Sequence, residues 1–101
     1  MVPTVQVWVD ASRGVAGRDR EVLHLSPRGV ALLDAFAHAG PRVMGRQELR
    51  RRIGLTQHDP RRCDSLIVQL RRALGPEAIV TVRGRGWRCA VDVVPVDVHR
   101  T

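Results

Sequence analysis

The chain has 101 residues, which is room for one small domain, and no segment approaches the ~18 consecutive apolar residues of a membrane span. Hydrophobic residues make up 44% and aromatic residues only 3%, so we expect a folded core built mainly from Val, Leu, Ile and Ala. The net charge of +7 is carried by 17 arginines and indicates an acidic partner, while the length excludes a separate catalytic module.

Residues 5–25 are expected to form a small antiparallel sheet. Residues 5–9 read V-Q-V-W-V, an alternation that predicts a half-buried strand, and residues 21–25 form a second short run. The polar, glycine-containing stretch between them predicts hairpin turns, with a brief strand around residues 14–16 as a further option.

Three helices are predicted within residues 26–75. The first begins at Ser26-Pro27, because the Ser hydroxyl can accept a hydrogen bond from an unpaired N–H and Pro fits the first helical position. This helix runs to about residue 39, where a Gly-Pro pair ends it. A second, short helix is predicted over about residues 46–53.

The third helix, over about residues 60–74, is the most informative segment, and Asp59-Pro60 provides its start signal. Its apolar residues follow the spacing of one buried stripe, namely Cys63, Leu66, Ile67, Leu70 and Leu74. The opposite face has no acidic residue and consists of Arg61, Arg62, Ser65, Gln69 and Arg72. A helix with an apolar back and a basic, hydrogen-bonding front can be seated in the major groove of duplex DNA.

Residues 79–91 predict a β-hairpin that turns at Gly84-Arg85-Gly86. The tip is basic and sterically bare, so Arg85 can approach a minor groove closely; a simple turn is the alternative interpretation. Residues 92–101 have no clear cap and are either an extra edge strand or a loose tail. A sheet, three helices and a terminal hairpin together outline an α+β winged helix-turn-helix, expected as one domain over residues 1–101.

The arginines are concentrated in one part of the chain. Residues 42–88 carry twelve arginines against four acidic residues, whereas residues 1–41 carry four of each. Because neutralising phosphates releases counterions and supplies most non-specific affinity for DNA, this concentration fits a polyanion-binding face. A merely solvated basic face is the alternative, and composition alone does not separate DNA from RNA or an acidic protein.

Four stretches of the sequence resemble the C-terminal effector domain of OmpR/PhoB-type response regulators. They are L-S-P-R-G-V-A-L-L-D-A-F (25–36), R-V-M-G-R-Q-E-L (42–49), R-R-C-D-S-L-I-V-Q-L-R-R-A-L (61–74) and I-V-T-V-R-G-R-G-W-R (79–88). The last two, in this order and spacing, are the specific ones, and the similarity spans most of residues 5–91. The resemblance implies a four-stranded N-terminal sheet, three helices and a C-terminal wing. It also implies sequence-specific binding of double-stranded DNA by a transcription regulator, with tandem or paired copies on direct repeats.

The resemblance further implies which residues meet DNA. Carried over by position, the phosphate contacts would be Arg61, Arg62 and Arg71, the residues facing base edges Ser65 and Gln69, and the wing contacts Thr81 and Arg83. The residues themselves add Arg72 on the basic helix face and Arg85 at the hairpin tip. Because glutamine can bond N6 and N7 of adenine together, we expect an adenine preference opposite Gln69. An ion pair between Arg71 and Asp64 is an equally good interpretation of Arg71.

The sequence departs from the family pattern at several points. Apolar residues stand at 66 and 68, where the family is usually polar or basic, and Trp87 replaces a Tyr. RNA polymerase is a further partner that the family implies, through a loop that is short here, over residues 54–58.

Functions other than DNA binding have less support in the sequence. No nucleophile with a partner base and no carboxylate pair is evident, so we expect neither an enzyme nor a cofactor. The cysteines, Cys63 and Cys89, lack metal-ligand spacing and are expected to pack in the core of a cytoplasmic, reduced protein with no membrane partner. A basic RNA-binding module is one rival, although stacking aromatic residues are scarce. A winged helix that binds an acidic protein is the other.

Overall fold

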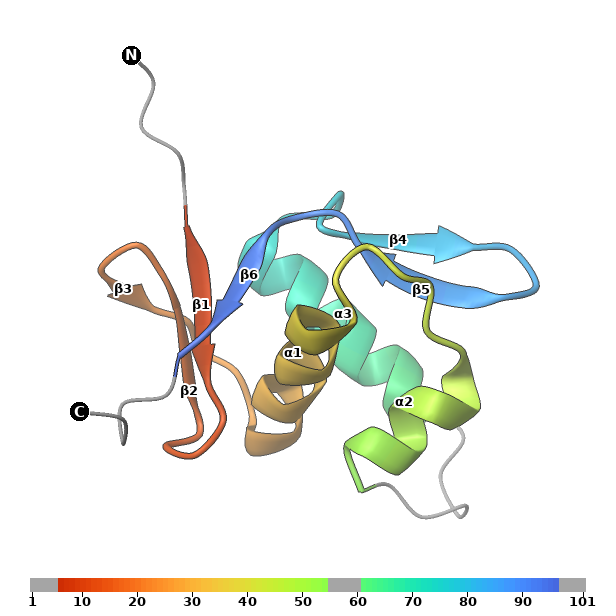
Figure 1. Ribbon diagram of the computed structural model, residues 1–101, viewed down its shortest axis with the longest axis horizontal. Helices are drawn as coiled ribbons and strands as arrows, with labels where there is room; N and C mark the ends of the chain where they lie inside the picture. The colour runs from red at the N-terminus through yellow and green to blue at the C-terminus, as the bar shows by residue number, and fades with distance from the viewer. Residues whose placement is uncertain (1–5, 55–60, 97–101) are drawn as a thin grey trace.

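The computed structural model describes residues 6–54 and 61–96 (Figure 1). The elements in chain order are β1 (Val7–Asp10), β2 (Val15–Arg18), β3 (Glu21–Val22), α1 (Pro27–Ala39), α2 (Arg46–Arg52), α3 (Arg62–Leu74), β4 (Ile79–Val82), β5 (Gly86–Cys89) and β6 (Val93–Pro95). The predicted α+β class is confirmed, and the optional strand near residue 15 is present as β2. The predicted helix start at Asp59-Pro60 lies outside the described residues.

The first sheet has four strands in the order β3-β2-β1-β6. The pairs β1–β2 and β2–β3 are antiparallel, whereas β6 runs parallel to β1, with Val93 opposite Val7. The antiparallel strands expected within residues 5–25 are thus confirmed, and the segment after the hairpin adds a fourth, parallel strand. Parallel neighbours require a long connection, and here β2, β3, all three helices and the hairpin lie between β1 and β6 in the chain. Of the two interpretations of residues 92–101, an extra edge strand is correct for Val93–Pro95.

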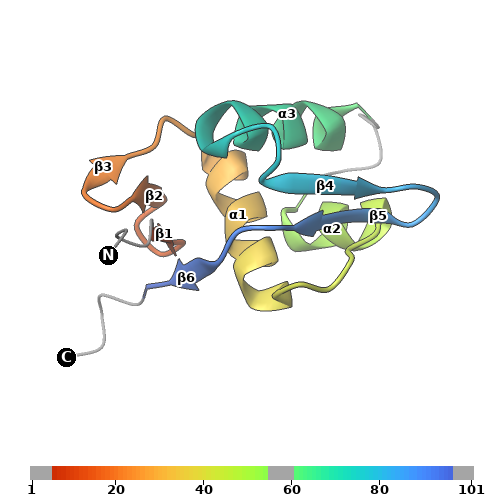
Figure 2. The same ribbon diagram turned by 90° about the horizontal axis from the view of Figure 1, so that it is seen from above.

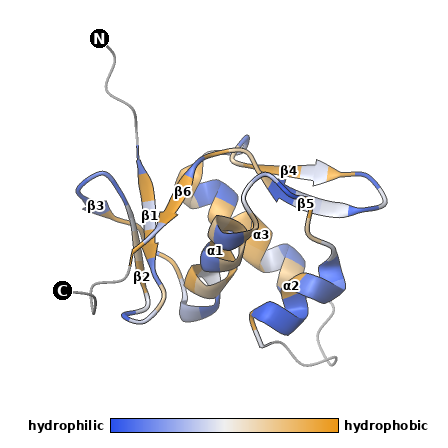
Figure 3. Cartoon of the chain, in the orientation of Figure 1, coloured by the Kyte–Doolittle hydropathy of each residue, from blue (hydrophilic) through white to orange (hydrophobic). Residues whose placement is uncertain are grey.

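Helix α1 is the central element of the core. It packs on β1 and β6 on one side and on α2 and α3 on the other, an arrangement visible in Figures 1 and 2. Its side chains Leu32, Leu33 and Phe36 are almost completely buried, and Figure 3 shows hydrophobic segments on α1, α3 and β1. Among the helices of residues 6–54 and 61–96, none is long and apolar enough to span a bilayer.

The ends of α1 form as predicted. The Ser26 hydroxyl accepts a hydrogen bond from the Gly29 N–H at 3.1 Å, and Pro27 occupies the first helical position. Gly40, with φ 64°, ends the helix and donates its N–H to the Phe36 carbonyl. The fixed start of α1 matters for the site, because α3 is anchored to it.

Candidate nucleic-acid interface

Helix α3 turns its apolar stripe inward and leaves the opposite side in solvent. All five predicted stripe residues are buried. We define the outer face of α3 by five exposed residues of the helix and its N-cap, Arg61, Arg62, Ser65, Val68 and Arg72; Asp64, on the flank of this face, is also exposed. The Ser65 hydroxyl donates to the Arg61 carbonyl at 3.2 Å, so it remains available as an acceptor, for example for the exocyclic amine of adenine or cytosine.

Gln69 is turned away from solvent toward the start of α1. Its Oε1 accepts hydrogen bonds from the Ser26 N–H at 2.8 Å and from the Ser26 hydroxyl at 3.0 Å. A bidentate contact with adenine needs the same oxygen, so in this conformation Gln69 does not present its amide to a base edge. Instead, Gln69 fixes α3 against the cap of α1.

Gly29 makes the Gln69 contact possible. A Cβ atom at this buried position would lie 2.1 Å from the Gln69 Oε1, far inside van der Waals contact. Glycine costs up to ~1 kcal/mol in a helix relative to alanine. Its presence in the first turn of α1 is thus explained by the close approach of the Gln69 amide.

Arg71 joins α3 to the hairpin. Its Nε and Nη2 donate to the Ile79 carbonyl at 3.0 and 2.9 Å, and Nη2 also donates to the Thr81 hydroxyl at 2.9 Å. The ion pair with Asp64 is therefore wrong, because the half-buried guanidinium bonds to β4 and Asp64 pairs elsewhere; the phosphate contact of Arg71 stays a prediction. Thr81 takes part in the same junction.

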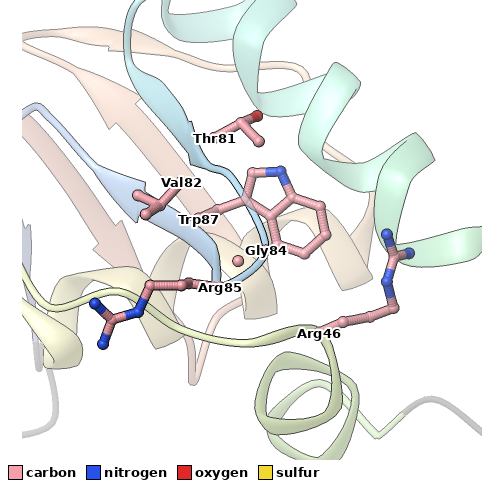
Figure 4. Close-up of a pocket in the computed structure, with 7 residues that line it drawn as sticks. Arg46, Thr81, Val82, Gly84, Arg85 and Trp87 are labelled. Atoms are coloured by element: carbon pink, nitrogen blue, oxygen red, sulfur yellow. The ribbon is translucent and has the colours of Figure 1, made fainter.

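Asp64 instead pairs with α2. Its Oδ1 lies 3.0 Å from Nη1 of Arg46, whose guanidinium carbon is 5.1 Å from the centre of the Trp87 ring. This distance is within the range of a cation–π contact. Figure 4 shows Arg46 beside the indole, at the edge of a hollow between α2 and the hairpin. Sequence reasoning missed Arg46, because its partners stand 18 and 41 residues further along the chain.

Backbone contacts hold the base of the β4–β5 hairpin in place, and the hairpin tip extends beyond these contacts. Met44 and Trp87 exchange two backbone hydrogen bonds, of 2.7 and 3.0 Å, which tie β5 to the segment between α1 and α2. Gly86 has φ 137°, and a Cβ there would lie 2.1 Å from the Met44 carbonyl oxygen. Beyond this anchor Arg83, Gly84 and Arg85 are exposed, and Figure 4 shows the Arg85 side chain directed away from Trp87. The predicted basic tip is therefore present on a rigid base.

Helix α2 consists mostly of hydrophilic residues (Figure 3), and part of its charge is neutralised. Arg42 and Arg52 both pair with Glu48, at 2.8 and 3.6 Å. Hydrogen bonding to Arg42 lowers the pKa of Glu48, and the same bond raises the pKa of Arg42. Arg42, which precedes α2, and Arg52 on α2 are therefore both partly committed to Glu48.

A sheet-backed trio of helices, with an exposed basic helix next to a basic hairpin, defines the winged helix-turn-helix class. The sequence model of the family described as "Transcriptional regulatory protein, C terminal" matches residues 19–89, and the chain belongs to this family of OmpR/PhoB-type domains. The resemblance inferred from the four sequence stretches is thereby confirmed.

Solved structures share the fold. The DNA-binding domain of CpxR from E. coli is 30% identical, with a TM-score of 0.68 over 85% of this chain and 88% of that one. The DNA-binding domain of E. coli CadC is 25% identical, with a TM-score of 0.70 over 89% of this chain and 95% of that one. The Klebsiella pneumoniae RstA DNA-binding domain, solved in complex with the RstA box, is 25% identical, with a TM-score of 0.68 over 81% and 88% of the two chains. Comparison with curated proteins found no match.

Proposed function

We propose that this domain binds specific sequences of double-stranded DNA for a transcription regulator, with α3 in the major groove and the hairpin on the adjacent backbone or minor groove. One observation carries the proposal: α3 covers its whole apolar stripe and exposes arginines with a hydrogen-bonding side chain between them. A groove about 12 Å wide admits such a helix. The related RstA domain, whose structure contains its DNA box, supports the same kind of ligand.

The exposed residues divide into two groups by chemistry. We assign phosphate contacts to the exposed guanidinium groups of Arg61, Arg62, Arg72, Arg83 and Arg85, since phosphate contacts set position and affinity. Ser65, in the middle of the outer face of α3, is assigned to a base edge. Arg71, Thr81 and Gln69 are proposed to act indirectly, by holding α3 and the hairpin at a fixed angle.

Competition binding tests the proposal against its rivals. The affinity of the full chain is measured for duplex DNA, single-stranded DNA and duplex RNA at several salt concentrations, followed by selection of sites from a randomised duplex library. We expect duplex DNA to be preferred and one sequence pattern to be enriched. Preference for RNA would favour the basic RNA-binding alternative, and no nucleic-acid binding at low salt would favour a winged helix that binds an acidic protein.

The proposal includes the setting and the partners of the domain. Cys63 and Cys89 are buried free thiols, and burial raises the pKa of both, which suits inert packing residues of a cytoplasmic regulator. We further propose paired copies on direct repeats, and RNA polymerase as the partner of an activating form. Binding stoichiometry on one and on two copies of the selected site tests the pairing. The proposed role requires no catalysis and no cofactor.

A further inference from the structure

Val68 is an apolar residue at the centre of a polar surface. Its relative exposure is 44%, and the other exposed large hydrophobic residues within residues 6–54 and 61–96, Val22 and Val94, lie on strands. At 100° per residue, Val68 points opposite the buried stripe of α3, together with Ser65 and Arg72 one turn before and after it. Core packing therefore does not account for a valine at this position.

The flanks of the outer face of α3 are already committed to other elements. Gln69 on one side bonds to Ser26, and on the other side Asp64 pairs with Arg46 and Arg71 bonds to the hairpin. Of the side chains in the middle of the helix, Ser65 and Val68 are thus left at the centre of the surface that would face the bases. This makes the chemistry of Val68 important for recognition.

The major groove offers one apolar group to such a side chain, the C5-methyl of thymine. We infer that Val68 is a specificity-determining residue that selects thymine by packing its two methyl groups on that C5-methyl. The inference rests on the proposed function and replaces the adenine preference expected from Gln69. A contact of one methyl group is worth roughly a three- to tenfold change in affinity, from the transfer free energy of an apolar carbon.

The experiment compares thymine with deoxyuridine, which lacks only the methyl group. Sites are first selected from a randomised duplex library with the full chain, and each thymine of the preferred site is then replaced singly by deoxyuridine. Dissociation constants are measured for the wild type and for Val68→Ser, Val68→Thr and Val22→Ala. Serine and threonine have helix propensities close to that of valine, so thermal unfolding should confirm that the fold is retained.

We expect at least one thymine position at which deoxyuridine weakens wild-type binding about three- to tenfold. This penalty should disappear in Val68→Ser, remain in part in Val68→Thr, which keeps one methyl group, and remain in full in Val22→Ala on β3. If the deoxyuridine penalty depended on residue 68 at none of the thymines of the selected site, this inference would be overturned while the proposed function would stand. Failure to select any duplex would overturn the proposed function, and this inference with it.

Discussion

Three contacts made by single side chains decide which residues of α3 are available to a ligand. The Ser26–Gln69 hydrogen bonds, the Arg71–Ile79 bonds and the Arg46–Asp64 pair each engage a polar side chain of α3 with a neighbouring element, although Asp64 stays about half exposed. Each is made with a different neighbour: α1, the hairpin and α2. The helix is thus positioned by its own polar flanks, and only the strip between them can face DNA.

The Gln69 contact predicts an unusual response at Gly29. In an exposed helix, Gly→Ala stabilises by up to ~1 kcal/mol, but Gly29→Ala should destabilise by about 1–3 kcal/mol, because the new Cβ displaces the Gln69 amide from its partners. Gln69→Ala alone should cost a similar amount. In the Gln69→Ala background the nearest remaining atom is the Ser26 Oγ, 3.3 Å from the new Cβ, so Gly29→Ala should cost much less than in the wild type. Chemical denaturation of the four proteins measures this coupling, and strictly additive effects would contradict it.

The adjacent arginines Arg71 and Arg72 provide a matched pair of opposite roles. Arg71→Ala should lower the free energy of unfolding by about 1–3 kcal/mol, because it leaves the Ile79 carbonyl and the Thr81 hydroxyl without their charged donor. Arg72→Ala removes an exposed side chain and should leave stability within about 0.5 kcal/mol, while weakening DNA binding. Thermal unfolding and DNA titration of both variants check this. If both variants lost the same stability, the hydrogen bonds from Arg71 to the hairpin would not be what stabilises the fold.

At the scale of the elements, local signals explain what could be predicted and long-range pairing explains what could not. The Ser26 cap, the α3 stripe and the Gly84 turn are encoded within a few residues, and all three are present in the structure. The pairing of β6 with β1 joins residues 86 positions apart, and nothing in the local pattern of either strand specifies it. The sequence indicates an edge strand within residues 92–101 as one option, but it specifies neither the strand that pairs with it nor the direction of the pairing.

The candidate site was predicted less completely than the fold, for the same reason. The outer face of α3 and the basic tip follow from helical and hairpin periodicity. The partners of Gln69 and Asp64 depend on how α1 and α2 pack, which periodicity does not specify. One signal was available: Gln69 lies one turn after Leu66, at the edge of the apolar stripe, where a polar side chain can reach a neighbouring helix.

The hairpin depends on one close backbone contact. Gly86→Ala should destabilise the protein by roughly 3 kcal/mol or more, because φ is 137° and the new Cβ meets the Met44 carbonyl oxygen and the Gly45 Cα. Gly84→Ala is the control. Its φ of 73° also favours glycine, but no atom lies within 4 Å of the new Cβ, so a cost of about 1 kcal/mol is expected. Denaturation of both variants distinguishes the clash from the backbone preference. Similar losses would mean that the Met44 contact is not rigid.

At the scale of the whole molecule, the question is whether the net charge or its placement drives binding. The residues that form the four-stranded sheet have a net charge close to zero, whereas the helices and the hairpin carry most of the arginines. The β1–β2 turn, where Arg13 lies, and the hairpin tip are at different ends of the molecule in Figure 1. Removing any one arginine lowers the net charge by the same amount, so variants at the two ends separate the two effects.

Arg62→Ala, Arg83→Ala and Arg13→Ala make that comparison at constant net charge. A side chain that contacts a phosphate displaces about one counterion, so Arg62→Ala and Arg83→Ala should each flatten the plot of log affinity against log salt by roughly one unit. Arg13→Ala should leave the slope unchanged, although it weakens the long-range field equally. Titrations of one selected duplex at four or five salt concentrations give the slopes. If Arg13→Ala changed the slope as much as the other two, the domain would attract DNA by its total charge, and the outer face of α3 with the hairpin tip would not be its interface.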